Sequence, residues 1–166
     1  MSKMKKILYL CVTLCVVTSL YAQTAVQPTK KNDGFEKVTN LYLAGKLIDT
    51  AYMSMIDSVA ASALDNGEFY SISEMSENLK QYEKVAWSKK EYGSYRIDYF
   101  TILMNNVYLS GKWGSSIFYA EKIARQSEKE NMSRPFIEPG IKMYIYSITN
   151  QEDKQIETYE KHKKLI

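Results

Sequence analysis

Residues from which catalytic and metal sites are usually built are scarce in this sequence. Its 166 residues include two cysteines and one histidine. Cys11 and Cys15 both lie in the first 22 residues, so removal of that segment would leave no thiol for a disulfide or for nucleophilic attack. His162 stands among lysines, and one histidine without a cysteine cannot form a His/Cys zinc site. We therefore expect neither a metal nor a cofactor.

A phosphate-binding loop and an activated nucleophile are also missing. Gly111 and Gly114 do not have the spacing of a P-loop, nor the Lys-Ser/Thr pair that ends it. Ser115 and Ser116 have no neighbouring base that could activate them. A small glycan- or lipid-handling enzyme would need a pair of carboxylates in one pocket, and the sequence does not reveal such a pair. The expected protein is not an enzyme.

The first 22 residues have the pattern of a secretion signal. Three lysines precede an uncharged, largely apolar run of 14 residues from 7 to 20, and Ala22 offers a cleavage site before Gln23. The run is shorter than the ~20 residues that span a bilayer. We expect an exported protein that is periplasmic, associated with the cell envelope or secreted. The alternative is an uncleaved signal, which would then be the contact with the membrane.

Cleavage at this site would leave a chain without net charge. Three of the 22 basic residues lie in the signal and none of the 19 acidic residues does, so 19 of each remain. A neutral surface gives no electrostatic reason to expect nucleic acid or an anionic membrane as the partner.

Helical periodicity dominates the rest of the chain, and no segment has the alternating pattern of a strand. Residues 23–34 are polar and without period, which predicts a flexible leader. From 35 to 166, apolar residues recur at steps of three and four, which predicts about seven antiparallel helices. One of them covers 47–64, with an apolar line formed by Ile48, Tyr52, Met55, Val59 and Ala63. The predicted fold class is all-α.

Signals for helix ends divide this region. Ser71 and Glu74 have the spacing of a capping box, ahead of an apolar line at Ile72, Met75, Leu79, Tyr82 and Ala86. A break is expected at 92–94, around Gly93. Farther on, Gly111 stops a helix, because glycine tolerates the left-handed conformation that helix C-termini favour. Apolar stripes on both sides of this turn predict an antiparallel hairpin, formed by Ile97, Phe100, Leu103, Met104, Val107 and Tyr108 before it and Trp113, Ile117, Ala120, Ile123 and Ala124 after it.

Parts of this hairpin recur along the chain. Residues 41–47 match residues 107–113 at an offset of 66, with a Tyr and a Gly-Lys pair in equivalent places. An aliphatic residue followed by Tyr, Glu and Lys occurs at Leu79, Ile117 and Ile156, which are 38 and 39 residues apart. Periods in this range are typical of stacked helical hairpins.

These segments resemble divergent tetratricopeptide repeats, a family with ~34 residues in each helix–turn–helix unit. The residues that match the family's packing, aromatic and small positions around the turn are Phe100, Leu103, Val107, Trp113 and Ser116. Met104 and Ala120 depart from the pattern, since the family has a small residue at the first position and a bulky aromatic at the second. The resemblance implies antiparallel hairpins stacked as a short α-solenoid over 35–166. An ordinary helical bundle is the alternative.

The resemblance also implies a site. In this family the inner helix of each hairpin lines a concave surface that holds peptides or other proteins. The matching positions here are Asp98, Thr101, Asn105 and Tyr108. A carboxamide such as Asn105 both donates and accepts hydrogen bonds, so it can clamp an extended peptide backbone. The implied function is a non-enzymatic module that binds a protein or peptide, although these residues could also be exposed polar positions without a role.

Two further features bear on the function. Twelve of the 14 tyrosines follow residue 22, and several of them cluster at 92–108, which suits a binding groove or a thin core that leaves side chains half-exposed. Leu165 and Ile166 end the sequence inside an apolar-periodic helix without the polar cap that a solenoid's end requires. An alternative function is therefore a sensory or regulatory input domain of a larger or truncated envelope signalling protein.

Overall fold

The fold is seen in a computed structural model that describes residues 33–132 and 134–164. Within these residues the chain forms seven α-helices, one short 3-10 helix and no strand, so the predicted all-α class is confirmed. In chain order the elements are α2 (Gly34–Leu43), α3 (Asp49–Asp65), α4 (Ile72–Ala86), η1 (Lys90–Tyr92), α5 (Gly93–Leu109), α6 (Trp113–Lys129), α7 (Ile137–Ile148) and α8 (Glu152–His162). The predicted signal, 1–22, and the predicted leader up to residue 32 lie outside the described residues.

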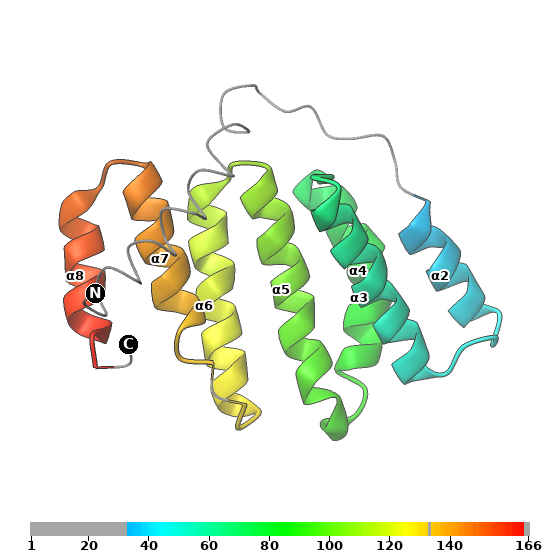
Figure 1. The fold of residues 1–166 in the computed structure, drawn as a ribbon. Coiled ribbons are helices and arrows are strands. Elements are labelled where there is room, and N and C mark those ends of the chain that lie inside the picture. Colours follow the sequence, from blue (N-terminus) through cyan, green and yellow to red (C-terminus); the bar gives the residue numbers. More distant parts are fainter. Residues whose placement is uncertain (1–32, 133, 165–166) are drawn as a thin grey trace, which may run out of the picture.

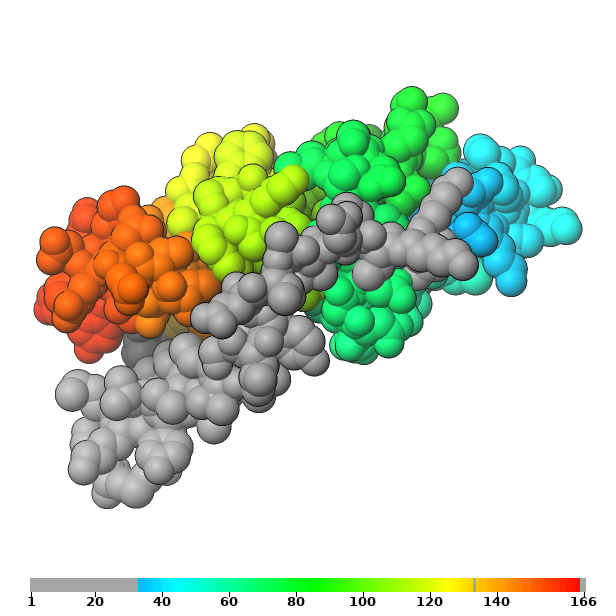
Figure 2. Space-filling view, turned by 90° about the horizontal axis from the view of Figure 1, so that it is seen from above, coloured from blue at the N-terminus to red at the C-terminus, as the bar shows by residue number. Residues whose placement is uncertain are grey.

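The helices follow one another in chain order, from α2 at one end to α8 at the other, with α3 and α4 overlapping in the view (Figure 1). Each helix packs against the next one, and α2 also packs on α4 and α3 on α5. Seen from above, the body is elongated along this row (Figure 2). In the described part of the chain, no helix has the length and apolar composition needed to cross a membrane.

Five of the helices end in the same way, with one residue in the left-handed region. After it, the next N–H donates to the carbonyl oxygen five residues back, as Lys112 does to Val107 at 3.0 Å. Three of these residues are glycines, at φ values near +70°, and two are asparagines, the next most tolerant residue. They are Gly45, Gly67, Gly111, Asn131 and Asn150. The predicted turn at Gly111 is therefore confirmed.

Replacing Gly111 by alanine is expected to destabilise the protein by about 1–2 kcal/mol, because a Cβ is strained at its φ of +71°. Gly114 is the matched control. It lies in the first turn of α6, where an added Cβ meets nothing within 4 Å, so alanine there should be neutral or stabilise by up to about 1 kcal/mol. Urea unfolding followed by far-UV circular dichroism measures both. Equal effects at the two glycines would contradict the turn.

The end of α4 is capped by a side chain instead. Its last carbonyl, that of Ala86, accepts a hydrogen bond from Arg96 Nη1 at 2.7 Å, and Arg96 also donates to the carbonyls of Lys89 and Lys90. The same guanidinium forms a two-bond ion pair with Glu130, at 2.7 and 3.0 Å. Arg96, a residue of α5, thus joins α4 and η1 to Glu130, the residue that follows α6.

Gly93 belongs to this contact rather than to a chain break. The sequence predicted a break at 92–94, but Gly93 is the first residue of α5. The break in the helix lies earlier, between the end of α4 at Ala86 and the start of η1 at Lys90. A Cβ at Gly93 would clash with the Glu130 carboxylate, which Arg96 holds in place. Glycine is required here by close approach, because φ of Gly93 is an ordinary helical −56°.

The core explains the tyrosine content. Of the twelve tyrosines among the described residues, six are half-buried, as the sequence led us to expect. Five others are buried: Tyr52, Tyr70, Tyr82, Tyr92 and Tyr99. The rings pack inside while several hydroxyls reach polar partners, as Tyr82 does with Asp57 at 2.9 Å. A second, smaller cluster between α5 and α6 is formed by Ile97, Met104, Ala120 and Ile123.

Two predicted apolar stripes are partly wrong. In α3 the buried residues are Tyr52, Met53, Ile56 and Ala63, whereas Ile48 and Met55 are exposed. The buried face is rotated because α3 packs against three helices, α2, α4 and α5, rather than one. In α6, Ala120 and Ile123 are buried but Ile117 is only half-buried. The capping box at Ser71 and Glu74 is confirmed, with Ile72 exposed at the helix start.

Candidate binding pocket

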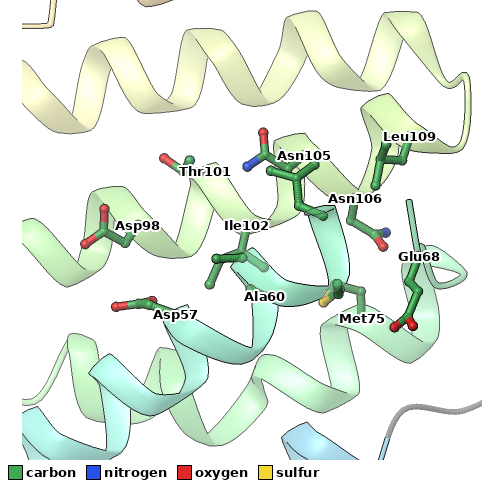
Figure 3. Close-up of a pocket in the computed structure, with 13 residues that line it drawn as sticks. Asp57, Ala60, Glu68, Met75, Asp98, Thr101, Ile102, Asn105, Asn106 and Leu109 are labelled. Carbon is green, nitrogen blue, oxygen red and sulfur yellow. The ribbon is translucent and has the colours of Figure 1, made fainter. Parts of the chain in front are cut away.

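A pocket of about 330 Å³ lies between α3 and α5, near the segment that leads into α4. This is close to the lower end of the volume range of ligand sites. Figure 3 shows Asp57 of α3 and Asp98 of α5 at one end, Glu68 at the other, and Ala60 and Ile102 between them. The described residues that line it are Asp57, Ala60, Ala61, Ala63, Leu64, Glu68, Met75, Asp98, Thr101, Ile102, Asn105, Asn106 and Leu109. The pocket is therefore a slot with apolar residues between a pair of carboxylates at one end and a single carboxylate at the other.

Three of the four site residues expected from the sequence line this pocket: Asp98, Thr101 and Asn105. Thr101 donates its hydroxyl proton to the carbonyl of Ile97 at 3.0 Å, so toward a ligand its oxygen can act as an acceptor. Asp98 and Asn105 are half-buried and make no side-chain hydrogen bond to another described residue. Their carboxylate and carboxamide groups are thus available to a ligand.

Tyr108 is not brought together with the other three. Its ring packs on Trp113 at a centroid distance of 5.6 Å and on Tyr144 of α7 at 5.8 Å. Its position is therefore set by contacts that join α5 to α6 and α7, outside the lining of the pocket.

The acidic end of the pocket holds two carboxylates that share one environment. Burial raises the pKa of Asp57 to about 6, the hydrogen bond from Tyr82 partly offsets this rise, and the charge of Asp98 adds to it. Burial also raises the pKa of Asp98, while the charge of Arg134 acts in the opposite direction. Both groups lie where a negative charge is unfavourable unless a cation is close.

The raised pKa of Asp57 predicts a pH-dependent gain of stability when its charge is removed. The unfolded carboxyl has a pKa of about 3.9, so the folded state binds more protons between that value and about 6. The stability due to this group is thus complete below about pH 4 and is lost as the pH rises through about 6. Asp57→Asn keeps an acceptor for Tyr82 without the charge. It should stabilise the protein by roughly 1–2 kcal/mol at about pH 8, discounted for partial exposure, and by little at about pH 4. Urea unfolding at both pH values measures this, and an equal gain at both would contradict it.

Asn106 forms the kind of backbone clamp that was expected of its neighbour Asn105. Its carboxamide oxygen accepts from the backbone N–H of Tyr70 at 2.8 Å, and its amide nitrogen donates to the carbonyl of the same residue at 3.0 Å. Asn106 is buried and lines the pocket. It therefore fixes the segment before α4, and with it the end of the pocket that carries Glu68.

No protein-family model, curated protein or solved structure matches this chain. The function is therefore inferred from the chemistry of the pocket.

The pocket contains residues that sequence reasoning missed, notably Asp57, Glu68 and Asn106. A signal for Asp57 was present, because it lies in a helical row with Met53, Ala60 and Leu64, all apolar. A carboxylate in such a row faces other helices or a pocket. The described residues contain no group of three His, Cys, Asp or Glu side chains that could hold a metal ion. His162 lies on α8, outside the pocket lining, with Nδ1 2.9 Å from the carbonyl oxygen of Thr158.

Proposed function

We propose that this protein is an exported, non-enzymatic helical-repeat module that binds a protein or peptide partner through the pocket between α3 and α5. The observation that carries the proposal is the convergence in one slot of Asp98, Thr101 and Asn105, the positions implied by the repeat resemblance, with the apolar surface of Ala60 and Ile102. Apolar walls with a few placed polar groups are typical of binding sites.

The repeat interpretation draws support from the helix ends. Gly45 and Gly111 take the same left-handed conformation in the segments that match at an offset of 66. That offset is close to twice the ~34 residues of a tetratricopeptide unit. The matched glycines end α2 and α5, so in such an array these two would be equivalent inner helices, and α5 contributes Asp98, Thr101 and Asn105 to the pocket.

Asp57 supports a functional role for the pocket on energetic grounds. A half-buried carboxylate with a raised pKa lowers the stability of the folded protein at neutral pH. Charged groups held at such a cost are typical of functional sites, where the ligand supplies the missing interaction.

The same carboxylates raise the question of catalysis, since a glycan- or lipid-handling enzyme would need such a pair in a pocket. Acid–base catalysis by two carboxyls works when their environments move the two pKa values apart. Here burial raises the pKa of both Asp57 and Asp98. A cation bound near both carboxylates would favour the charged form of each, so the pair suits recognition of a cation.

The double variant Asp98→Ala with Asn105→Ala tests the proposed function. It should reduce crosslinked capture of partners from the native envelope fraction at least about tenfold, because it removes two polar contacts of roughly 1 kcal/mol or more. Neither side chain has a hydrogen bond to another described residue, so the melting temperature should not fall. Asp153→Ala with Asn40→Ala, both at exposed positions on other helices, is the matched control. Unchanged capture of every partner by the double variant would refute the pocket as the site.

A further inference from the structure

We infer that the pocket takes the basic side chain, lysine or arginine, of a peptide partner. This inference rests on the proposed function and names the chemistry of its ligand. The aliphatic stem of the basic residue would lie along Ala60 and Ile102, and its cation would lie between Asp57 and Asp98.

Charge complementarity identifies the occupant. Among the described residues that line the pocket are three carboxylates, those of Asp57, Glu68 and Asp98, and no lysine or arginine. Asp57 and Asp98 stand at the same end of the slot (Figure 3). A negatively charged ligand would be repelled there, and a neutral one would leave two half-buried charges uncompensated.

The apolar middle of the slot restricts the kind of cation. Ala60, Leu64 and Ile102 present an apolar surface next to the carboxylates. A hydrated metal ion or a small ammonium ion makes no use of such a surface. Lysine and arginine combine a long apolar stem with a charged head, and they bury the first while the second reaches a polar group. Tyr82 holds one of the acceptors in place, because its hydroxyl donates to Asp57 Oδ1 at 2.9 Å.

A neighbouring cation allows an independent test of the inference. Arg134, in the connection between α6 and α7, lies near enough to Asp98 to lower its pKa, but it is not part of the pocket lining. If the pocket takes a cation, Arg134 opposes its entry. Removing the charge of Arg134 should strengthen binding, whereas removing the charge of Asp98 should weaken it.

Four pools of short, labelled, otherwise neutral peptides test the inference, with lysine, arginine, norleucine or glutamate at the central position. Fluorescence anisotropy with the full chain should show the lysine or arginine pool binding at least about tenfold more tightly than norleucine, and glutamate most weakly. Asp98→Asn should abolish this preference and Arg134→Gln should increase it. Asp153→Asn removes the same charge from an exposed position on α8 and should leave the binding of all four pools unchanged.

The pH dependence provides a second readout. The titratable groups that act on Asp57 are Tyr82 of α4 and Asp98 of α5. Behind them, Tyr95 lies near Tyr82 and Arg134 lies near Asp98. Protonation of Asp57 between about pH 7.5 and 5 should weaken binding of the basic pools. Asp57→Asn should flatten this dependence, while norleucine binding should be insensitive to pH in both proteins.

The outcomes separate the inference from the function on which it rests. Equal binding of norleucine and lysine pools would overturn the inference and leave peptide binding intact. Absence of binding by all four pools would overturn both. Competition by spermidine without binding of the lysine pool would identify a small polyamine as the ligand. Binding of Ca²⁺ or Mg²⁺ that is lost in Asp98→Asn would identify a metal site. Either of these results would overturn the peptide assignment.

Discussion

Replacing Ile123 by aspartate is expected to destabilise the protein by on the order of 3–5 kcal/mol. Ile123 of α6 is fully buried and packs with Ile97, Met104 and Ala120. A carboxylate at this position would be desolvated without a partner, and the packing of α6 against α5 would be lost. Thermal and urea unfolding monitored by far-UV circular dichroism should show a large fall in stability.

Two isoleucines on the same and a distant helix calibrate this effect. Ile117 of α6 is half-buried, so Ile117→Asp should have a clearly smaller effect than Ile123→Asp. Ile156 of α8 is 53% exposed, and aspartate there should change stability by no more than about 0.5 kcal/mol. If the substitution at Ile117 is as damaging as that at Ile123, the face of α6 that packs on α5 has been assigned wrongly.

The variant Arg96→Met should also destabilise the protein strongly, by about 3–5 kcal/mol, since it leaves the Glu130 carboxylate poorly exposed and without its cation. The substitution removes hydrogen bonds to the carbonyls of Ala86, Lys89 and Lys90 as well. Those carbonyls end α4 and begin η1, where no left-handed residue follows Ala86 to satisfy them. We expect the loss to appear in amide hydrogen exchange first at the end of α4.

Arg125→Met is the control for charge alone. Arg125 forms a 3.4 Å ion pair with Glu121 on the exposed side of α6, and such pairs contribute about 0–1 kcal/mol. Arg96→Lys tests the geometry, because a single ammonium group cannot reach the carboxylate and three carbonyls together. It should recover less than half of the stability that Arg96→Met loses. Full recovery by lysine would mean that charge, rather than the planar fork of donors, is what Arg96 supplies.

Local signals in the sequence predicted the helices and most of their ends. Gly111 and the capping box of Ser71 and Glu74 act through hydrogen bonds to residues a few positions away, so their effect is readable without knowledge of the fold. Asn131 and Asn150 act in the same way as the glycines, because asparagine is the next most tolerant residue in the left-handed region.

The exposure of individual side chains was predicted less well. Met53 and Met55 are two residues apart on α3, yet the first is buried and the second exposed. Helical spacing limits which residues share a face, but it does not say how many neighbours the helix has. Because α3 contacts three helices, its buried face is wider than a single stripe and its centre lies elsewhere.

The candidate site shows the same division. Asp98, Thr101 and Asn105 lie on one helix, so their common face followed from spacing once the turn glycine was placed. Asp57 belongs to another helix, and its approach to Asp98 depends on how α3 packs on α5. Tyr108 shares the helix with the first three but is directed to Tyr144 by the packing of α7.

The amino-acid sequence by itself determined that the chain is helical, where several of its helices stop, and which polar residues share a face of α5, because these properties arise from interactions within one or two turns of helix. The tertiary structure alone decided that Asp57 and Asp98 meet in a pocket and that Arg96 links α4 to Glu130, because these pairs lie on different helices whose relative positions are set by packing of the whole core.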